Sequence, residues 1–130
     1  MPLLMLMTRA FARFARRERV PDAALTDAIA RIGEGSIDAE LGGGLFKQRV
    51  ARPGQGRSGG WRTIIVHRTG DRAVFVHGFA KSAKSNLSPK ELAELKRLAS
   101  VILAMKAKDV RSMIENGDWI EVDEDDGDEA

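Results

Sequence analysis

The stretch Gly42–Lys84, GGGLFKQRVARPGQGRSGGWRTIIVHRTGDRAVFVHGFAKSAK, decides the fold, because it contains three runs that read as β-strands. These runs are residues 45–51, 61–68 and 72–80. The glycine-rich segment 53–60 reads as a loop after the first run, and Thr69-Gly70-Asp71 reads as a tight turn after the second. The pattern therefore predicts an antiparallel meander of three strands.

The same stretch is strongly basic. From Gly44 to Lys84 it holds nine Lys or Arg and one acid, Asp71, which is a local charge of +8. The strand period places Lys47 and Arg49 on one face of the first run, and Arg62 opens the neighbouring run. A cationic surface carried by strands, with almost no carboxylates, predicts a site for a polyanion, which we interpret as RNA.

Alternation also predicts which strand residues share a face. In the second run Arg62, Ile64 and Val66 should face one way, and the other face should carry Trp61, Thr63, Ile65 and His67. In the third run one face should carry Phe75, His77 and Phe79, and the other Val74, Val76 and Gly78.

The flanking segments predict helices and two further strands. Residues 3–8 read as an apolar strand, 9–19 as an amphipathic helix with arginines outside, and 22–32 as a second helix. Ser88-Pro89-Lys90-Glu91 is a capping box that begins a long helix. A shorter helix over 109–115 and a strand over 119–122 should follow.

The fold class predicted from these elements is α+β. We expect a small twisted antiparallel sheet of four or five strands with helices packed on one side, and a cationic face opposite the N-terminal helices. Residues 1–122 should form a single domain, and 123–130 an acidic, disordered tail. The last ten residues carry seven acids, and without them the net charge rises from +2 to +9, which is typical of a nucleic-acid binder.

Composition narrows the chemistry. There is no cysteine, which excludes disulfides and thiolate zinc sites, and the two histidines have no carboxylate cluster beside them in sequence. We therefore expect no metal and no cofactor. No run approaches the roughly 18 apolar residues that a membrane span needs, so we expect a cytoplasmic protein with no membrane contact.

A cluster of cations can support RNA cleavage through the 2′-hydroxyl. That reaction needs a base for the hydroxyl, positive charge around the phosphate, and an acid for the departing 5′-oxygen. The residues with the right chemistry lie in or near the strands: Lys47, Arg49, Arg57, Arg62, Lys81 and Lys84.

The stretch from Gly42 to Ser88 resembles the signature region of RelE/ParE-superfamily toxins, closest to the HigB-like, RelE-type branch. The resemblance lies in the basic strand LFKQRVA, the glycine-rich hinge, the strand GGWRTIIV and the return FVHGFAKS, and it extends over residues 5–122. It implies the toxin of a type II toxin–antitoxin module. Such a toxin is an mRNA endonuclease that acts with the ribosome and pairs with a cognate antitoxin, commonly a helix-turn-helix protein.

The resemblance also implies roles for individual residues. Lys47 and Arg49 would act as base and phosphate contact, Arg62 would stabilise the transition state, and Lys81 or Lys84 would lie on the leaving-group side. We expect further RNA contacts from Arg52, Arg57, Trp61 and Arg68.

One departure concerns a tyrosine that the best-known RelE enzymes use at the edge of the site, because this chain has no tyrosine. Asn86 or Ser88 lies near the corresponding place, and Trp61 and Phe79 could replace the stacking function. Two alternative functions remain open at this point. One is a ParE-like inhibitor that binds a topoisomerase without cutting nucleic acid, and the other is an RNA-binding module without turnover.

Overall fold

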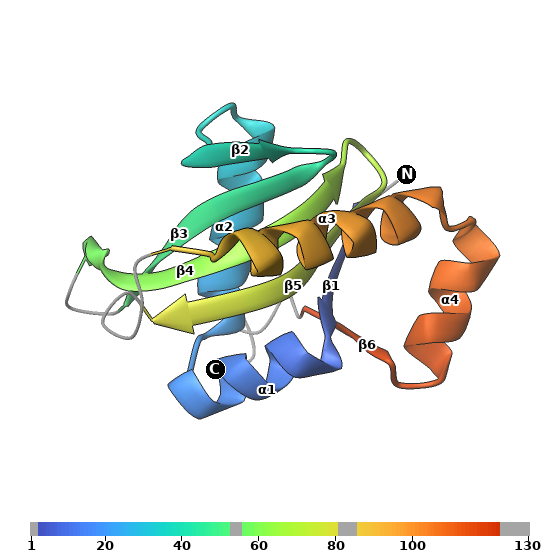
Figure 1. Ribbon diagram of the computed structural model, residues 1–130. Coiled ribbons are helices and arrows are strands. Elements are labelled where there is room, and N and C mark those ends of the chain that lie inside the picture. Colours follow the sequence, from blue (N-terminus) through green and yellow to red (C-terminus); the bar gives the residue numbers. More distant parts are fainter. Residues whose placement is uncertain (1–2, 53–55, 81–85, 123–130) are drawn as a thin grey trace.

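In the computed structural model a single sheet lies between two pairs of helices (Figure 1), and the structure describes residues 3–52, 56–80 and 86–122. The strands are β1 (Leu4–Thr8), β2 (Ala39–Gly42), β3 (Leu45–Arg52), β4 (Gly56–Arg68), β5 (Arg72–Ala80) and β6 (Trp119–Glu121). The helices are α1 (Arg9–Glu18), α2 (Asp22–Gly33), α3 (Pro89–Ala104) and α4 (Ala107–Glu115). The strand order is β2-β3-β4-β5-β1-β6, and only the β1–β5 pair is parallel. The predicted α+β class and the β3–β4–β5 meander are confirmed.

The N-terminal helices cover one face of the sheet, as predicted. The Thr8 hydroxyl accepts a hydrogen bond of 3.1 Å from the Phe11 amide and begins α1. The Phe11 ring then stacks on Phe75 of β5, with 4.9 Å between ring centroids. Pro21 separates the two helices, and α2 adds Leu25 and other apolar side chains to the same core.

The C-terminal helices cover the opposite face, so the expectation of helices on one side only is wrong. The predicted capping box at Ser88 and Glu91 is present and begins α3. Leu95 and Ile102 of α3 then pack on Ile64 and neighbouring apolar residues of the sheet. Because both faces of the sheet are apolar in its centre, each needs a helical layer to exclude water.

Three details of the sheet differ from the prediction. Strand β2 was not predicted, because it has four residues and a register shift against β3. Strand β4 begins at Gly56, so much of the predicted loop 53–60 is strand. There a Cβ on Gly60 would lie 2.1 Å from the carbonyl oxygen of Val50, so this close strand pairing requires glycine.

The third difference is a register shift between β4 and β5. Ile64 pairs with His77 but Ile65 pairs with Phe75, so β5 has one extra residue at this point. Phe75 consequently faces α1, whereas His77 and Phe79 face the other way, and the predicted face shared by all three does not exist.

Candidate functional site

Three predicted site residues meet on the sheet face opposite α1 and α2. Arg49 of β3 pairs in register with Arg62 of β4, and Lys47 lies two residues along the same face, opposite Ile64. We call Lys47, Arg49 and Arg62 the cationic cluster. Arg49 is exposed and Lys47 half-buried, whereas Arg62 is only 8% exposed. The β3–β4 pairing thus brings three positive side chains together, and among the described residues of these two strands no acid shares their face.

Arg62 is the unfavourable charge of the cluster. Burial lowers the pKa of its guanidinium, the positive charge of Arg49 lowers it further, and Asp38 opposes these effects to a smaller extent. Asp38 also interacts with other cations, at 3.9 Å from Arg49 Nε and 3.9 Å from Arg31 Nη1. Like charges opposite each other on a strand pair destabilise the sheet. An anionic ligand at the cluster would relieve this repulsion.

Gln48 fixes the strand that carries the cluster, and sequence reasoning did not identify it as important. Its side chain is fully buried, and its Nε2 donates to the carbonyls of Ala28 (3.0 Å) and Ser36 (3.2 Å). Its Oε1 accepts a 2.8 Å hydrogen bond from the amide of Asp38. Gln48 therefore holds β3 against α2 and places the Asp38 carboxylate beside Arg49. The available signal was a polar residue at a core-facing position of the strand.

The surroundings of the cluster include the end of β5 and the start of the segment before α3. Phe79 pairs in register with Arg62, and Asn86 Oδ1 accepts a hydrogen bond of 3.3 Å from Lys47 Nζ. Lys81 and Lys84 lie outside the described residues. The residues that bound this segment are nevertheless placed, because Ala80 pairs with Trp61 and Asn86 contacts Lys47.

The structure separates Trp61 and Arg52 from the cluster. Trp61 is 1% exposed in the core beneath α1 and α2, and its Nε1 donates to Glu18 at 2.9 Å. The Arg52 guanidinium lies 5.0 Å from the centre of the Trp61 ring and also binds Glu18 at 2.9 Å. The expectation that Trp61 stacks on RNA conflicts with this burial, and we withdraw it. Arg52 has a structural role on that face of the sheet.

The remaining basic residues of the stretch Gly42–Lys84 do not add described side chains to the cluster. Arg68 lies at the far end of β4, roughly 20 Å from Arg62 at strand rise, where it pairs with Asp71 at 3.3 Å. Arg72 is 3% exposed and donates to the carbonyls of Ile102 (2.8 Å) and Met105 (2.9 Å). Arg57 belongs to β4, but its side chain lies outside the described part of the structure.

Two of the four suggested replacements for the family tyrosine, Ser88 and Phe79, are also constrained by their contacts. The Ser88 hydroxyl accepts a hydrogen bond of 3.1 Å from Glu91 as the cap of α3, and Phe79 is 6% exposed. The Phe79 ring is therefore closed to a ligand, whereas Ser88 is exposed and its hydroxyl oxygen serves the helix cap. Asn86 remains beside the cluster through its contact with Lys47.

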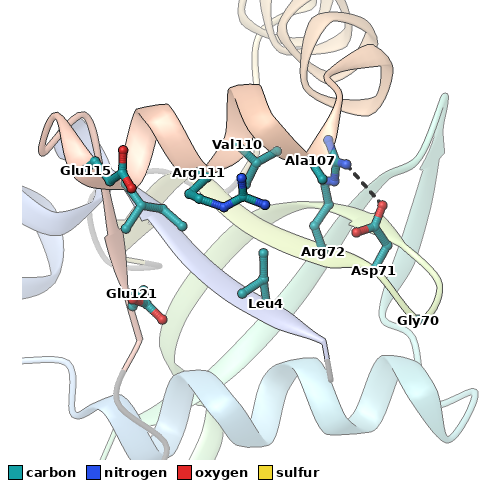
Figure 2. A pocket seen from close by; sticks show the side chains of 10 residues that line it. Leu4, Gly70, Asp71, Arg72, Ala107, Val110, Arg111, Glu115 and Glu121 are labelled. Atoms are coloured by element: carbon teal, nitrogen blue, oxygen red, sulfur yellow. Dashed lines mark ion pairs between the residues drawn. The ribbon is translucent and has the colours of Figure 1, made fainter. Parts of the chain in front are cut away.

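A groove lies away from the cationic cluster, between α4 and the start of β1 and β5 (Figure 2). It has a volume of about 600 Å³, and its walls carry Arg111 and Glu115 of α4 above Leu4 of β1. At one end Arg72 Nη2 pairs with Asp71 Oδ2 at 3.1 Å. Charges of both signs line this groove, so it lacks the single-signed potential that attracts a polyanion.

The described residues contain no group of three or more His, Asp or Glu that could hold a metal ion. In the same part of the chain, no helix is long and apolar enough to cross a membrane.

Comparison with known protein families gives one match. Residues 4–122 match the family model described as the RelE toxin of the RelE/RelB toxin–antitoxin system. A search of curated proteins found no match. The family match contains every strand and helix described above, including the cationic cluster, and it does not assign the HigB-like branch. The chain therefore belongs to the RelE toxin family, whose members act in toxin–antitoxin systems together with a cognate antitoxin.

Proposed function

We propose that the protein is an endoribonuclease toxin that cuts mRNA on the ribosome, in the cytoplasm, by attack of the RNA 2′-hydroxyl on the adjacent phosphate. The observation that carries this proposal is the Arg49–Arg62 pair, in which a nearly buried arginine lies in register with a second, exposed one. Such a pair is unfavourable in the free protein and favourable around a dianionic phosphorane.

The proposed reaction is a single internal transfer. A base removes the proton of the 2′-hydroxyl, the O2′–P bond forms, and the P–O5′ bond breaks. A proton passes to the departing 5′-oxygen, which leaves a 2′,3′-cyclic phosphate and a 5′-hydroxyl. The reaction consumes no water and no redox equivalent, and it requires only proton transfer and stabilisation of negative charge. Cationic side chains stabilise the negative charge and can donate the proton to the 5′-oxygen, and a lysine in its neutral amine form can accept the proton of the 2′-hydroxyl, so we propose that the reaction proceeds without a metal.

The residue roles follow from position in the cluster and from the family resemblance. Arg62 would bind the equatorial oxygens of the phosphorane, and Arg49 would contact the phosphate from the exposed side. Lys47 would accept the proton of the 2′-hydroxyl. Lys81 and Lys84 would serve the leaving group, and the positions of Ala80 and Asn86 at either end of their segment support that proposal.

Induced expression tests the proposal. Wild-type protein and Arg62→Met would be induced to equal abundance, and mRNA 5′-ends would be mapped by primer extension, with Arg111→Met of α4 as the control outside the cluster. We expect new ends within translated regions for wild type and Arg111→Met, and none for Arg62→Met. Growth arrest with intact mRNA and altered DNA supercoiling would instead favour a topoisomerase inhibitor. Arrest with intact mRNA and unaltered supercoiling would favour RNA binding without turnover.

A further inference from the structure

A second cationic recess lies at the edge of the sheet, between α1 and β5. Arg13 and Arg17, one helical turn apart, line it together with His77 and Gly78 of β5, and it encloses about 270 Å³. Both arginines are exposed. Among the described residues that line this Arg13/Arg17 recess, none is acidic. A recess with two guanidinium groups and no carboxylate favours an anion.

The recess exists because β5 extends beyond its parallel neighbour. Pairing between β1 and β5 ends at Met7 and Phe75. Within the described residues, the part of β5 after Phe75 therefore pairs with β4 on one side and has no strand on the other. There α1 lies beside the open edge (Figure 1). Its close approach requires glycine at position 78, because a Cβ there would lie 2.5 Å from the Phe14 ring. The backbone of β5 therefore borders the recess directly.

The arginine side chains have the geometry of a phosphate contact. The Arg17 guanidinium lies over the Phe14 ring, 5.8 Å from its centre, and the ring therefore holds it at the mouth of the recess. Side chains at i and i+4 start about 5–6 Å apart on a helix, so Arg13 and Arg17 can converge on one phosphate group. Guanidinium groups recognise phosphate oxygens through paired hydrogen bonds.

Strand β5 links the recess, at its open edge beside α1, to the cationic cluster on the other face of the sheet. His77 faces the same side of the sheet as Ile64, and Phe79 pairs with Arg62. The His77 and Phe79 ring centroids are 5.9 Å apart. At ordinary strand spacing, an RNA strand that leaves Arg62 would reach the recess past the end of β5 after roughly 10–15 Å.

We propose that the Arg13/Arg17 recess is a phosphate subsite for the RNA strand that flanks the cleaved bond. The identity of the ligand as RNA rests on the proposed function. The subsite contacts the sugar–phosphate backbone and carries no base preference, because its polar groups are guanidinium groups aimed at phosphate.

Helix α1 and its C-cap residue, Arg19, supply a matched control. Arg16 and Arg19 are also exposed, but they line a different cavity on the opposite flank of α1, together with Asp22 and Ile120. Neutralising either pair of arginines changes the net charge of the protein equally. A difference between the two double variants therefore reports position and not total charge.

The test measures binding of a 2′-O-methyl octanucleotide, which cannot be cleaved because it lacks the nucleophile, and of a dinucleotide too short to reach the recess. Fluorescence anisotropy over a series of salt concentrations would be recorded for full-length protein at low ionic strength. For Arg13→Gln/Arg17→Gln we expect octanucleotide affinity to fall about 10-fold or more, and the salt slope to decrease by about 0.7 for each lost phosphate contact. Dinucleotide affinity should not change.

Arg16→Gln/Arg19→Gln should keep the affinity and salt slope of the wild type. Equal losses in both double variants would overturn the subsite, since they would indicate long-range attraction only. No loss in either variant would also overturn it, as would a loss of antitoxin binding with RNA binding intact. Arg13→Gln alone, which leaves the Arg17–Phe14 contact in place, serves as the variant least able to disturb α1.

The subsite and the proposed nuclease function can fail separately. If octanucleotide binding depends on Arg13 and Arg17 but no new mRNA ends appear after induction, the subsite is supported and the nuclease function is contradicted. If new mRNA ends appear but octanucleotide binding does not depend on these arginines, the nuclease function is supported and the subsite is contradicted.

Discussion

Replacing Arg62 by methionine separates a functional charge from a structural one. Methionine retains the apolar stem of the side chain but removes the guanidinium of a residue that is 8% exposed and pairs in register with Arg49. If the charge of Arg62 serves to bind an anionic ligand, its removal relieves the cost of desolvating that charge and its repulsion with Arg49. If Arg62 instead stabilises the fold through its attraction to Asp38, its removal leaves the Asp38 carboxylate poorly compensated.

The two explanations predict opposite changes in stability. Like charges opposite each other on strands cost up to about 1 kcal/mol, and replacing buried charges by well-packed apolar groups is often neutral or stabilising by about 1–4 kcal/mol. We therefore expect the free energy of unfolding of Arg62→Met to lie between no change and a gain of about 2 kcal/mol. Breaking a buried stabilising ion pair would instead lower it by about 3–5 kcal/mol.

Activity should change in the opposite direction to stability. A preorganised donor to developing charge contributes about 10²–10³ in rate, so cleavage of mRNA by Arg62→Met should fall at least that far. Urea unfolding at pH 7 measures stability, and single-turnover cleavage on programmed ribosomes measures rate. A stability loss of about 3 kcal/mol or more, or cleavage within 10-fold of wild type, would refute the reasoning.

Three further predictions concern the framework of the site. Arg72→Met should lower the free energy of unfolding by about 2–4 kcal/mol in urea titration, because two carbonyls at the end of α3 lose their buried donor. Arg68→Met should change it by less than about 1 kcal/mol, because the ion pair of Arg68 with Asp71 is largely exposed. Gly78→Ala should lower it by about 1–3 kcal/mol, since its Cβ would overlap the Phe14 ring, and an unchanged thermal midpoint would contradict the packing described. Burial lowers the pKa of His67, so the folded state favours its neutral form. The free energy of unfolding should therefore decrease as the pH falls below about 6.5, where the unfolded chain binds the proton first. Urea titrations over this pH range should show a smaller decrease for His67→Gln than for wild type.

The cationic cluster was predictable from the strand period. Side chains two apart on a strand share a face, which placed Lys47 with Arg49 and put Trp61 on the face opposite to Arg62. The same period already argued against Trp61 as a partner of the cluster. Its burial depends on Glu18 of α1, which accepts a hydrogen bond from the Trp61 indole across a long sequence separation.

Other features depended on contacts that no local pattern encodes. The register shift opposite Ile64 reversed the expected face of Phe75 relative to His77, and it results from pairing between strands. Gln48 reads as an ordinary polar strand residue until α2 and the segment before β2 meet it with their carbonyls. The Arg13/Arg17 recess likewise requires α1 to lie at the unpaired edge of β5.

The most direct test of the proposed nuclease function is cleavage of a ribosome-bound mRNA that carries a single 2′-deoxy nucleotide at the position cut in the unmodified message. The proposed function predicts that wild-type protein leaves a 2′,3′-cyclic phosphate and a 5′-hydroxyl on the unmodified mRNA and does not cut the substituted bond. Cleavage of the substituted bond at the normal rate, or products ending in a 5′-phosphate, would contradict it.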